Sequence, residues 1–360
     1  MTRLTRADLD GLPSYVPGRN LADLTRELGI AEAIKLASNE VPYGPLPGVP
    51  EAVADAMLHS HRYPDMGAVA LRDALAARFD VTAERIVTGC GSVALAEILV
   101  KAVCLPGDEI VYAWRSFEAY PIISAGAGIT GVRVPNTDGH GHNLPAMADA
   151  ITDRTRIAIV CNPNNPTGTA VRKAELDRFV NQVPSDVLIV LDEAYRELVD
   201  DPDVPDGLVT YGDRPNVLVL RTMSKAWGLA GLRMGYLVAQ PEVASAIRKV
   251  LTPFSTSLVA QAAAIAALTQ EEEVRRRCAL VVAERGRVTA ALRAAGQNVP
   301  DSQANFVWLP LGERSAQFTQ VCESRGVIVR AYQPDGVRVT IGTPDENDAF
   351  LAAAEVAWKS

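Results

Sequence analysis

Residues 156–168 read RIAIVCNPNNPTG, an apolar run that ends in a turn sequence rich in asparagine, proline and glycine. The apolar part, Arg156–Cys161, shows no alternation of polar and apolar residues, so we expect both of its faces to be buried. The pattern returns at Asp186–Leu191, which leads into Asp192, and at Asn216–Leu220, which leads into a polar loop. Runs of this kind predict parallel strands at the centre of a sheet covered on both sides.

Further short runs of the same character lie on either side of these three, and several are separated by amphipathic stretches. The strand-like runs are Arg85–Thr88, Glu109–Tyr112, Gly131–Val134 and Gly235–Ala239, and the helix-like stretches include Ala68–Phe79, Val93–Val103 and Lys173–Asn181. The predicted fold class is α/β, with a large domain built on a mostly parallel sheet flanked by helices.

The pattern changes after about Pro241. Two long helical stretches are followed by three short strand-like runs and a last helix from Asp345; the helical stretches are Ser257–Leu268 and Glu271–Ala295, and the runs are Asn305–Leu309, Gly326–Arg330 and Gly336–Ile341. We expect a smaller α+β domain here. The predicted division is residues 1–40 as an N-terminal arm with a short helix near Leu21–Leu28 and part of the small domain, 41–245 as the large domain, and 246–360 as the small domain.

Composition excludes several classes of function. The 360 residues carry a formal net charge of −8, which disfavours a nucleic-acid or membrane surface. The beginning of the sequence carries no secretory signal, and the five cysteines are far apart, so we expect reduced thiols in a cytoplasmic protein. The longest apolar stretch, Leu258–Leu268, is too short to cross a bilayer.

Two motif-like features carry no chemistry in this interpretation. Gly126–Gly131 fits the dinucleotide pattern G-x-G-x-x-G, but a helix-like run precedes it and a strand follows, so it predicts a helix stop. The histidines form two pairs, His59 with His61 and His140 with His142, and neither has a neighbouring cysteine. We expect solvated loops at both pairs and no metal site.

Polar residues follow four of the predicted strands. They are Gly89–Ser92, Asn162–Gly168, Asp192–Tyr195, and Ser224-Lys225 with Arg233 downstream. Because ligands of such sheets bind beyond the carboxyl ends of the strands, these residues are expected to meet at one edge. Small residues at a helix N-terminus suit a phosphate, a buried lysine suits imine formation, and a buried carboxylate suits a cation such as a pyridinium.

Each of these features also has an ordinary structural explanation. The glycines and serine fit a plain turn, the lysine an exposed loop, Asp192 a helix N-cap, and Asn165 with its proline a tight turn. The four strand endings together are what indicate a site.

The chain resembles the fold-type I, class II aminotransferases that depend on pyridoxal 5′-phosphate. It is most similar to the histidinol-phosphate aminotransferase branch, and within it to the actinobacterial aromatic amino acid (phenylalanine) aminotransferases. The most specific run is Ser224-Lys225 with Gly231-Leu232-Arg233, in which the arginine follows the lysine by eight positions. The other resembling stretches are 36–40, 62–65, 89–93, 114–117, 162–168, 192–195, 302–306 and 337–340.

The resemblance implies roles for individual residues. The catalytic residues would be Lys225, which carries the cofactor as a Schiff base, Asp192, which pairs with the pyridine nitrogen, and Tyr195, which with Asn165 holds the ring oxygen. Phe117 would stack on the ring. The phosphate would be bound by Gly91, Ser92, Val93, Thr222, Ser224 and Arg233, with Tyr63 reaching it from the other subunit of a homodimer. The substrate would be bound by Asn39 and Arg338, with Tyr15 and Arg330 as weaker candidates.

The activity implied is reversible transfer of the amino group of phenylalanine or tyrosine, with tryptophan as a further candidate, to 2-oxoglutarate. Histidinol-phosphate aminotransferase is the alternative, because an arginine fork accepts a phosphate as well as a carboxylate and Arg330 could supply additional charge. Many histidinol-phosphate enzymes have an acidic residue where Val93 stands and Pro-Thr-Tyr in place of Arg115-Ser116-Phe117, which weakens a substrate assignment by analogy with them. Aromatic donors are preferred because the stretches around Trp114–Phe117 and Asn305–Leu309 resemble the aromatic subgroup. A scaffold without turnover, and a β-lyase or decarboxylase on the same fold, are also compatible with the sequence.

Overall fold

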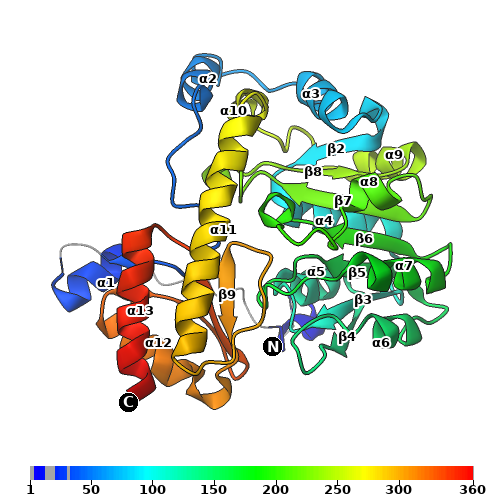
Figure 1. Cartoon of the computed structure of the whole chain (residues 1–360). Helices are drawn as coiled ribbons and strands as arrows, with labels where there is room; N and C mark the ends of the chain where they lie inside the picture. The colour runs from blue at the N-terminus through cyan, green and yellow to red at the C-terminus, as the bar shows by residue number, and fades with distance from the viewer. Residues whose placement is uncertain (1–3, 13–20, 31–32, 360) are drawn as a thin grey trace.

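A computed structural model describes residues 4–12, 21–30 and 33–359 of the chain. It confirms the predicted fold class: a large, mostly parallel sheet lies between helices, and a smaller group of strands and helices packs beside it (Figure 1). The predicted helix near the N-terminus is α1, Leu21–Leu28.

Seven strands form the large sheet, in the order β2-β8-β7-β6-β5-β3-β4. Strand β8 is antiparallel to both of its neighbours, and the other adjacent pairs are parallel. The strands are β2 (Ile86–Gly89), β3 (Glu109–Trp114), β4 (Thr130–Pro135), β5 (Thr155–Cys161), β6 (Leu188–Asp192), β7 (Val217–Thr222) and β8 (Gly235–Val238). Each coincides, to within a few residues, with a run predicted from the sequence.

Helices cover both faces of this sheet. On one face, apolar residues of α4 (Gly91–Val103), α5 (Ala119–Ala127) and α9 (Pro241–Val250) share a core with the strands. The opposite face packs against α3 (Val69–Phe79), α6 (Leu144–Asp149), α7 (Lys173–Gln182) and α8 (Gly207–Tyr211). The non-alternating strand sequences follow from this double coverage.

The C-terminal part contains two small sheets. Strands β11 (Arg330–Tyr332), β12 (Gly336–Thr340) and β9 (Phe306–Leu309) form an antiparallel sheet, while β1 (Ile34–Lys35) pairs in parallel with β10 (Val327–Ile328). The single run predicted at residues 326–330 is therefore two strands that belong to different sheets. Helices α12 (Ser315–Ser324) and α13 (Pro344–Lys359) pack on these strands, and short 3-10 turns occur at Ala7–Leu9, Ala83–Arg85, Arg196–Leu198, Ala230–Leu232 and Gly312–Arg314.

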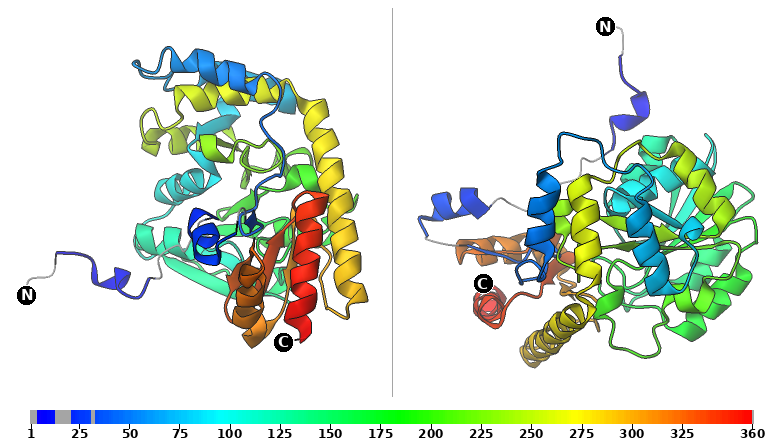
Figure 2. Two further views of the ribbon diagram at one scale, coloured as in Figure 1. Left: turned by 90° about the vertical axis from the view of Figure 1, so that its left-hand side faces the viewer. Right: turned by 90° about the horizontal axis from the view of Figure 1, so that it is seen from above.

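Two helices connect the parts of the molecule. The long α11 (Glu271–Ala294) contacts α13 in the C-terminal part and the 3-10 turn Arg196–Leu198, which follows β6 of the large sheet. Helix α10 (Leu258–Leu268) lies beside α2 (Val49–Met57), as Figure 2 shows from above. Helix α9 was not predicted from the sequence pattern, and residue 245 lies within it. We propose the division into residues 1–40, 41–245 and 246–360 as a working description of the domains.

The prediction of solvated histidines was wrong for His142. This side chain is buried, and burial lowers its pKa to about 4. By contrast, the helix stop at Gly126–Gly131 is confirmed, since α5 ends at Ala127 and Gly128 follows with a φ of 74°. Within the described part of the chain, no helix is long and apolar enough to cross a membrane, and no group of three or more potential metal ligands gathers.

Candidate active site

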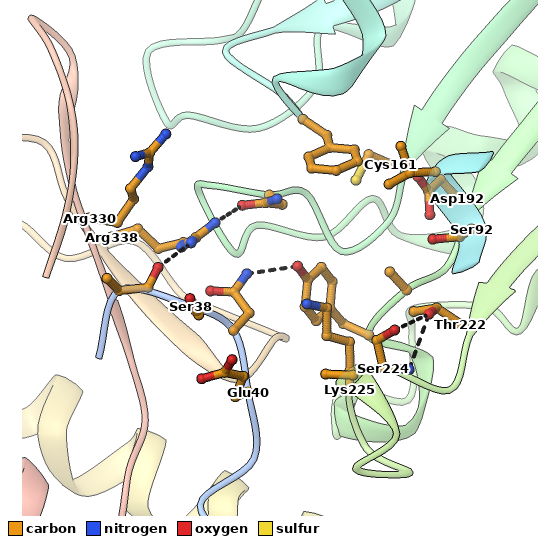
Figure 3. Close-up of a pocket in the computed structure, with 18 of the residues that line it drawn as sticks. Ser38, Glu40, Ser92, Cys161, Asp192, Thr222, Ser224, Lys225, Arg330 and Arg338 are labelled. Carbon is orange, nitrogen blue, oxygen red and sulfur yellow. Dashed lines mark hydrogen bonds between the residues drawn. The ribbon is translucent and has the colours of Figure 1, made fainter. Parts of the chain in front are cut away.

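A pocket of about 390 Å³ lies at the carboxyl ends of the large sheet's parallel strands, next to β11 and β12 (Figure 3). Most of the residues predicted for the site line it: Asn39, Ser92, Val93, Phe117, Asn165, Asp192, Tyr195, Thr222, Ser224, Lys225, Arg233, Arg330 and Arg338. The predicted convergence of strand endings at one edge is therefore present in the folded chain.

Lys225 lies in the loop that joins β7 to β8, and its side chain reaches into the pocket. Burial lowers the pKa of its ammonium group to about 8, and the positive charges of Arg338 and Arg233 act in the same direction. Its Nζ is 5.9 Å from the centre of the Tyr195 ring. A lysine whose neutral form is accessible near neutral pH is a competent nucleophile.

Asp192 is the last residue of β6 and is 5% exposed. Its Oδ2 accepts a hydrogen bond of 2.7 Å from the hydroxyl of Tyr120, whereas its buried Oδ1 has no partner among the described residues. Burial raises the pKa of this carboxyl to about 6. Within the described residues no helix starts directly after Asp192, since the next element is the 3-10 turn Arg196–Leu198, so a helix N-cap does not explain the residue. A buried carboxylate with an unused oxygen needs a cationic or proton-donating group.

The side chains around Arg338 form a connected network. The guanidinium, from β12, donates to Asn165 Oδ1 at 2.6 Å, to the Tyr332 hydroxyl at 2.8 Å and to the Ala37 carbonyl at 2.7 Å. Asn39 Nδ2 donates to the Tyr195 hydroxyl at 2.8 Å. Burial raises the pKa of Tyr195 above its usual range, so this tyrosine is a neutral hydrogen-bonding group.

Small and polar residues gather where β2 meets α4, around Gly91 and Arg233, and are called the cradle below. Gly91 has a φ of 82°, and a Cβ placed on it would lie 2.5 Å from Nη2 of Arg233. Arg233 donates to Ser224 Oγ at 3.5 Å, and Thr222 Oγ1 contacts the same oxygen at 3.0 Å. Hydroxyl groups, a guanidinium and the N-terminus of a 13-residue helix together suit a phosphate.

Phe117 follows β3 and packs edge-on against Tyr120, with ring centroids 5.6 Å apart. Among the described residues, two that were predicted for the site do not line the pocket, namely Tyr63 and Gly91, although Gly91 precedes Ser92, which does. Tyr63 is 81% exposed and stacks on Phe254 with centroids 4.5 Å apart. Tyr15 lies outside the described residues.

Several residues of the site were missed by reasoning from the sequence. Tyr120 holds Asp192, Tyr332 holds Arg338, and Glu118 forms an ion pair of 2.9 Å with Arg330. The available signal for Tyr120 was its position close to Phe117 in the sequence, in the first turn of α5. Cys161, interpreted as an ordinary buried thiol, lines the pocket, but burial raises its pKa to about 12, so it is not a nucleophile near neutral pH.

Comparison with known proteins agrees with the geometry. The model of the family described as aminotransferase class I and II matches residues 31–353. The chain belongs to this family.

Relatives named aromatic amino acid aminotransferase match nearly the whole length of this chain. The protein of Streptomyces avermitilis is 55% identical over 97% of this chain and 96% of its own, and that of Rhodococcus jostii is 56% identical over 98% and 96%. Among solved structures, the histidinol-phosphate aminotransferase of Sinorhizobium meliloti in complex with pyridoxal-5′-phosphate is 27% identical and covers 100% of this chain and 99% of its own, with a TM-score of 0.89.

The residues of this aminotransferase fit pyridoxal phosphate. The unpartnered Oδ1 of Asp192 matches a pyridinium N–H, and the cradle at Gly91 and Arg233 matches the phosphate. Lys225, with its lowered pKa, lies in the same pocket.

Proposed function

We propose that this aminotransferase transfers the amino group of phenylalanine or tyrosine, with tryptophan as a further substrate, to 2-oxoglutarate. Its relatives named aromatic amino acid aminotransferase, at 51–56% identity, support this substrate class. The observation that carries the chemistry is the pocket that holds both Lys225 and the unpartnered, buried Oδ1 of Asp192.

When bound, pyridoxal phosphate supplies an electron sink that stabilises negative charge at the substrate Cα. Lys225 would carry the cofactor through Nζ and, when displaced by the substrate amine, remove and return the Cα proton. Asp192 would hold the ring nitrogen in its protonated form, since its Oδ1 is available while Tyr120 fixes Oδ2. Asn165 and Tyr195 would bind the ring oxygen, and Phe117 would cover one face of the ring.

The remaining residues position the cofactor phosphate and the substrate. Gly91, Ser92, Val93, Thr222, Ser224 and Arg233 would bind the phosphate. Arg338 would bind the substrate carboxylate through its guanidinium fork, together with Asn39. Tyr15 and Arg330 are further candidates for contact with the substrate.

We propose that the active form is a cytoplasmic homodimer in which Tyr63 reaches the phosphate of the partner subunit. In the single chain Tyr63 is exposed and outside its own pocket. Other large apolar side chains near Tyr63 in the sequence are also exposed, namely Met57, Leu58, Met66 and Val69, as is Phe254, on which Tyr63 stacks. A second copy of the chain would cover them.

The substitution Lys225→Ala tests the catalytic assignment. The variant should lose transamination by several orders of magnitude and lack the visible absorbance of lysine-bound cofactor, while Lys101→Ala, on the exposed side of α4, should retain both. Turnover by Lys225→Ala at the wild-type rate would refute the proposal. Glutamate as the product from 2-oxoglutarate separates transamination from a β-lyase or decarboxylase, and from a scaffold without turnover.

Histidinol-phosphate aminotransferase remains a second candidate because Arg330 lines the pocket beside Arg338. Initial rates with phenylalanine, tyrosine and histidinol phosphate, each with 2-oxoglutarate, distinguish the two. A large preference for histidinol phosphate would overturn the aromatic assignment.

A further inference from the structure

Two arginines enter the substrate end of the pocket side by side. Arg330 on β11 is the direct antiparallel partner of Arg338 on β12, so both side chains leave the same face of this small sheet. Both line the pocket, and Figure 3 shows them on the side away from Ser92 and Thr222. The positive charge available to a substrate depends on how each guanidinium is already paired.

The two guanidinium groups have partners of different charge. The hydrogen bonds of Arg338 go to neutral oxygens, those of Asn165, Tyr332 and the Ala37 carbonyl. Arg330 instead donates to the carboxylate of Glu118 at 2.9 Å. The side chains of this pair are 13% and 28% exposed, so water screens the pair less than it screens a surface ion pair. Glu118 therefore offsets the charge of one arginine and leaves that of the other.

The candidate donors differ in charge in a way that matches this arrangement. An aromatic amino acid presents one carboxylate, with a single negative charge, to the arginines. Histidinol phosphate has no carboxylate and presents a phosphate monoester, which carries about −1.5 to −2 at neutral pH. Binding of a phosphate dianion is strengthened by two guanidinium groups, whereas the single negative charge of a carboxylate is balanced by one.

We propose that Glu118 is a specificity-determining residue, which by pairing with Arg330 disfavours phosphate-bearing donors and leaves Arg338 for the carboxylate of an aromatic amino acid. This inference rests on the proposed function and adds a cause for the choice between its two candidate donors. Glu118 immediately follows Phe117 and precedes α5, so the residue that would stack on the cofactor ring and the one that sets the charge are adjacent in sequence.

A neighbouring ion pair provides a matched control. Arg115 binds Asp335, and this pair joins the same two segments as Glu118 and Arg330, namely the loop after β3 and the β11–β12 hairpin. Neither Arg115 nor Asp335 lines the pocket. Loss of the Arg115–Asp335 pair would remove an ion pair between the same two segments, the loop after β3 and the β11–β12 hairpin, without changing the charge of the residues that line the pocket.

The experiment is the donor half-reaction of the cofactor-loaded enzyme, followed by the change in cofactor absorbance after mixing with phenylalanine or histidinol phosphate. No 2-oxoglutarate is added, because its second carboxylate would also respond to Glu118. The measured quantity is the ratio of the two second-order rate constants. It is compared for wild type, Glu118→Gln, Arg330→Gln, the double variant and Asp335→Asn.

We expect Glu118→Gln to shift this ratio toward histidinol phosphate by about tenfold, as for loss of one close charge in a partly shielded site. Arg330→Gln should shift it toward phenylalanine, the double variant should lose the gain of Glu118→Gln, and Asp335→Asn should leave the ratio unchanged. An unmoved ratio in Glu118→Gln, or an equal shift in Asp335→Asn, would overturn the inference. Failure of the wild type to react with phenylalanine would instead refute the proposed function, and the effect of Glu118→Gln would then be read from the rate constant for histidinol phosphate alone.

Discussion

The hydroxyl of Tyr120 donates a hydrogen bond of 2.7 Å to Oδ2 of Asp192, and the second oxygen of this carboxylate has no partner among the described residues. The two residues lie 72 positions apart in sequence, and Asp192 lines the pocket. One oxygen is fixed by the protein, and the other is left for the group that the pocket accepts. This arrangement is unfavourable for the empty protein, because a buried charge lacks full compensation.

We expect Asp192→Asn to make the cofactor-free protein more stable and the enzyme inactive. Burial raises the pKa of Asp192 to about 6, so between about pH 4 and pH 6 the unfolded chain ionises while the folded chain stays protonated, and stability falls as pH rises through this window. The amide carries no charge and avoids this loss, which gives a gain of about 1–3 kcal/mol at neutral pH. Thermal unfolding and initial rates measure both effects, with exposed Asp186→Asn as the control. Retained turnover in Asp192→Asn would contradict the assigned role.

Uptake of pyridoxal phosphate by the cofactor-free protein should accelerate as pH rises, with a midpoint near the Lys225 pKa of about 8. Only the neutral amine attacks a carbonyl, and the pKa is lowered by burial and then by the charge of Arg338. Arg338→Gln should therefore move the midpoint upward, while Arg338→Lys keeps the positive charge and should leave it nearly unchanged. Stopped-flow absorbance across a pH series tests this, and an identical midpoint in Arg338→Gln would show that the charge has no influence.

Gly91→Ala should weaken cofactor binding by about tenfold or more. The residue has a φ of 82°, and the added methyl group would lie 2.5 Å from Nη2 of Arg233, so the guanidinium must leave the phosphate cradle. Gly286→Ala on α11, where an added Cβ meets nothing within 4 Å, is the control and should gain about 0.5–1 kcal/mol from helix propensity. Titration of the cofactor-free proteins with pyridoxal phosphate gives the dissociation constants. Equal affinities of Gly91→Ala and wild type would show that the cradle does not bind the cofactor phosphate.

His142→Gln should reduce the loss of stability in acid. Burial lowers the pKa of His142 to about 4, below the ordinary histidine value of about 6.5. As pH falls from about 6.5 to about 4, the unfolded chain binds a proton that the folded chain does not. The free energy of unfolding therefore decreases by up to about 3 kcal/mol over this interval. Denaturant unfolding at several pH values should show a flatter profile for His142→Gln, and the exposed His59→Gln should match wild type.

Mixing an inactive variant with one of weakened cofactor affinity tests whether Tyr63 acts across a dimer. One parent is Lys225→Ala and the other carries Tyr63→Ala, which should weaken phosphate binding. A hybrid dimer contains one site with both Lys225 and the partner's Tyr63 intact, so cofactor affinity and activity should rise above those of either parent after subunit exchange. No recovery in a sample shown by ultracentrifugation to contain hybrids would mean that Tyr63 does not serve the partner's site.

The sequence alone determined the strands of the large sheet and the position of the site. Runs such as Arg156–Cys161 are apolar on both faces, which is a local property, and the polar residues that end them must meet wherever parallel strands are aligned. Lys225, Asp192 and Arg233 were predicted in this way, and they line one pocket.

Only the tertiary structure decided how the charges in that pocket are paired. Glu118 and Arg330 are 212 positions apart, and no local pattern shows that one offsets the other. The burial of His142, the support of Asp192 by Tyr120 and the reversed direction of β8 likewise arise from contacts between distant segments. Local sequence sets which groups are present, whereas packing sets their solvation and partners, and it is solvation and partners that fix charge, pKa and the choice of substrate.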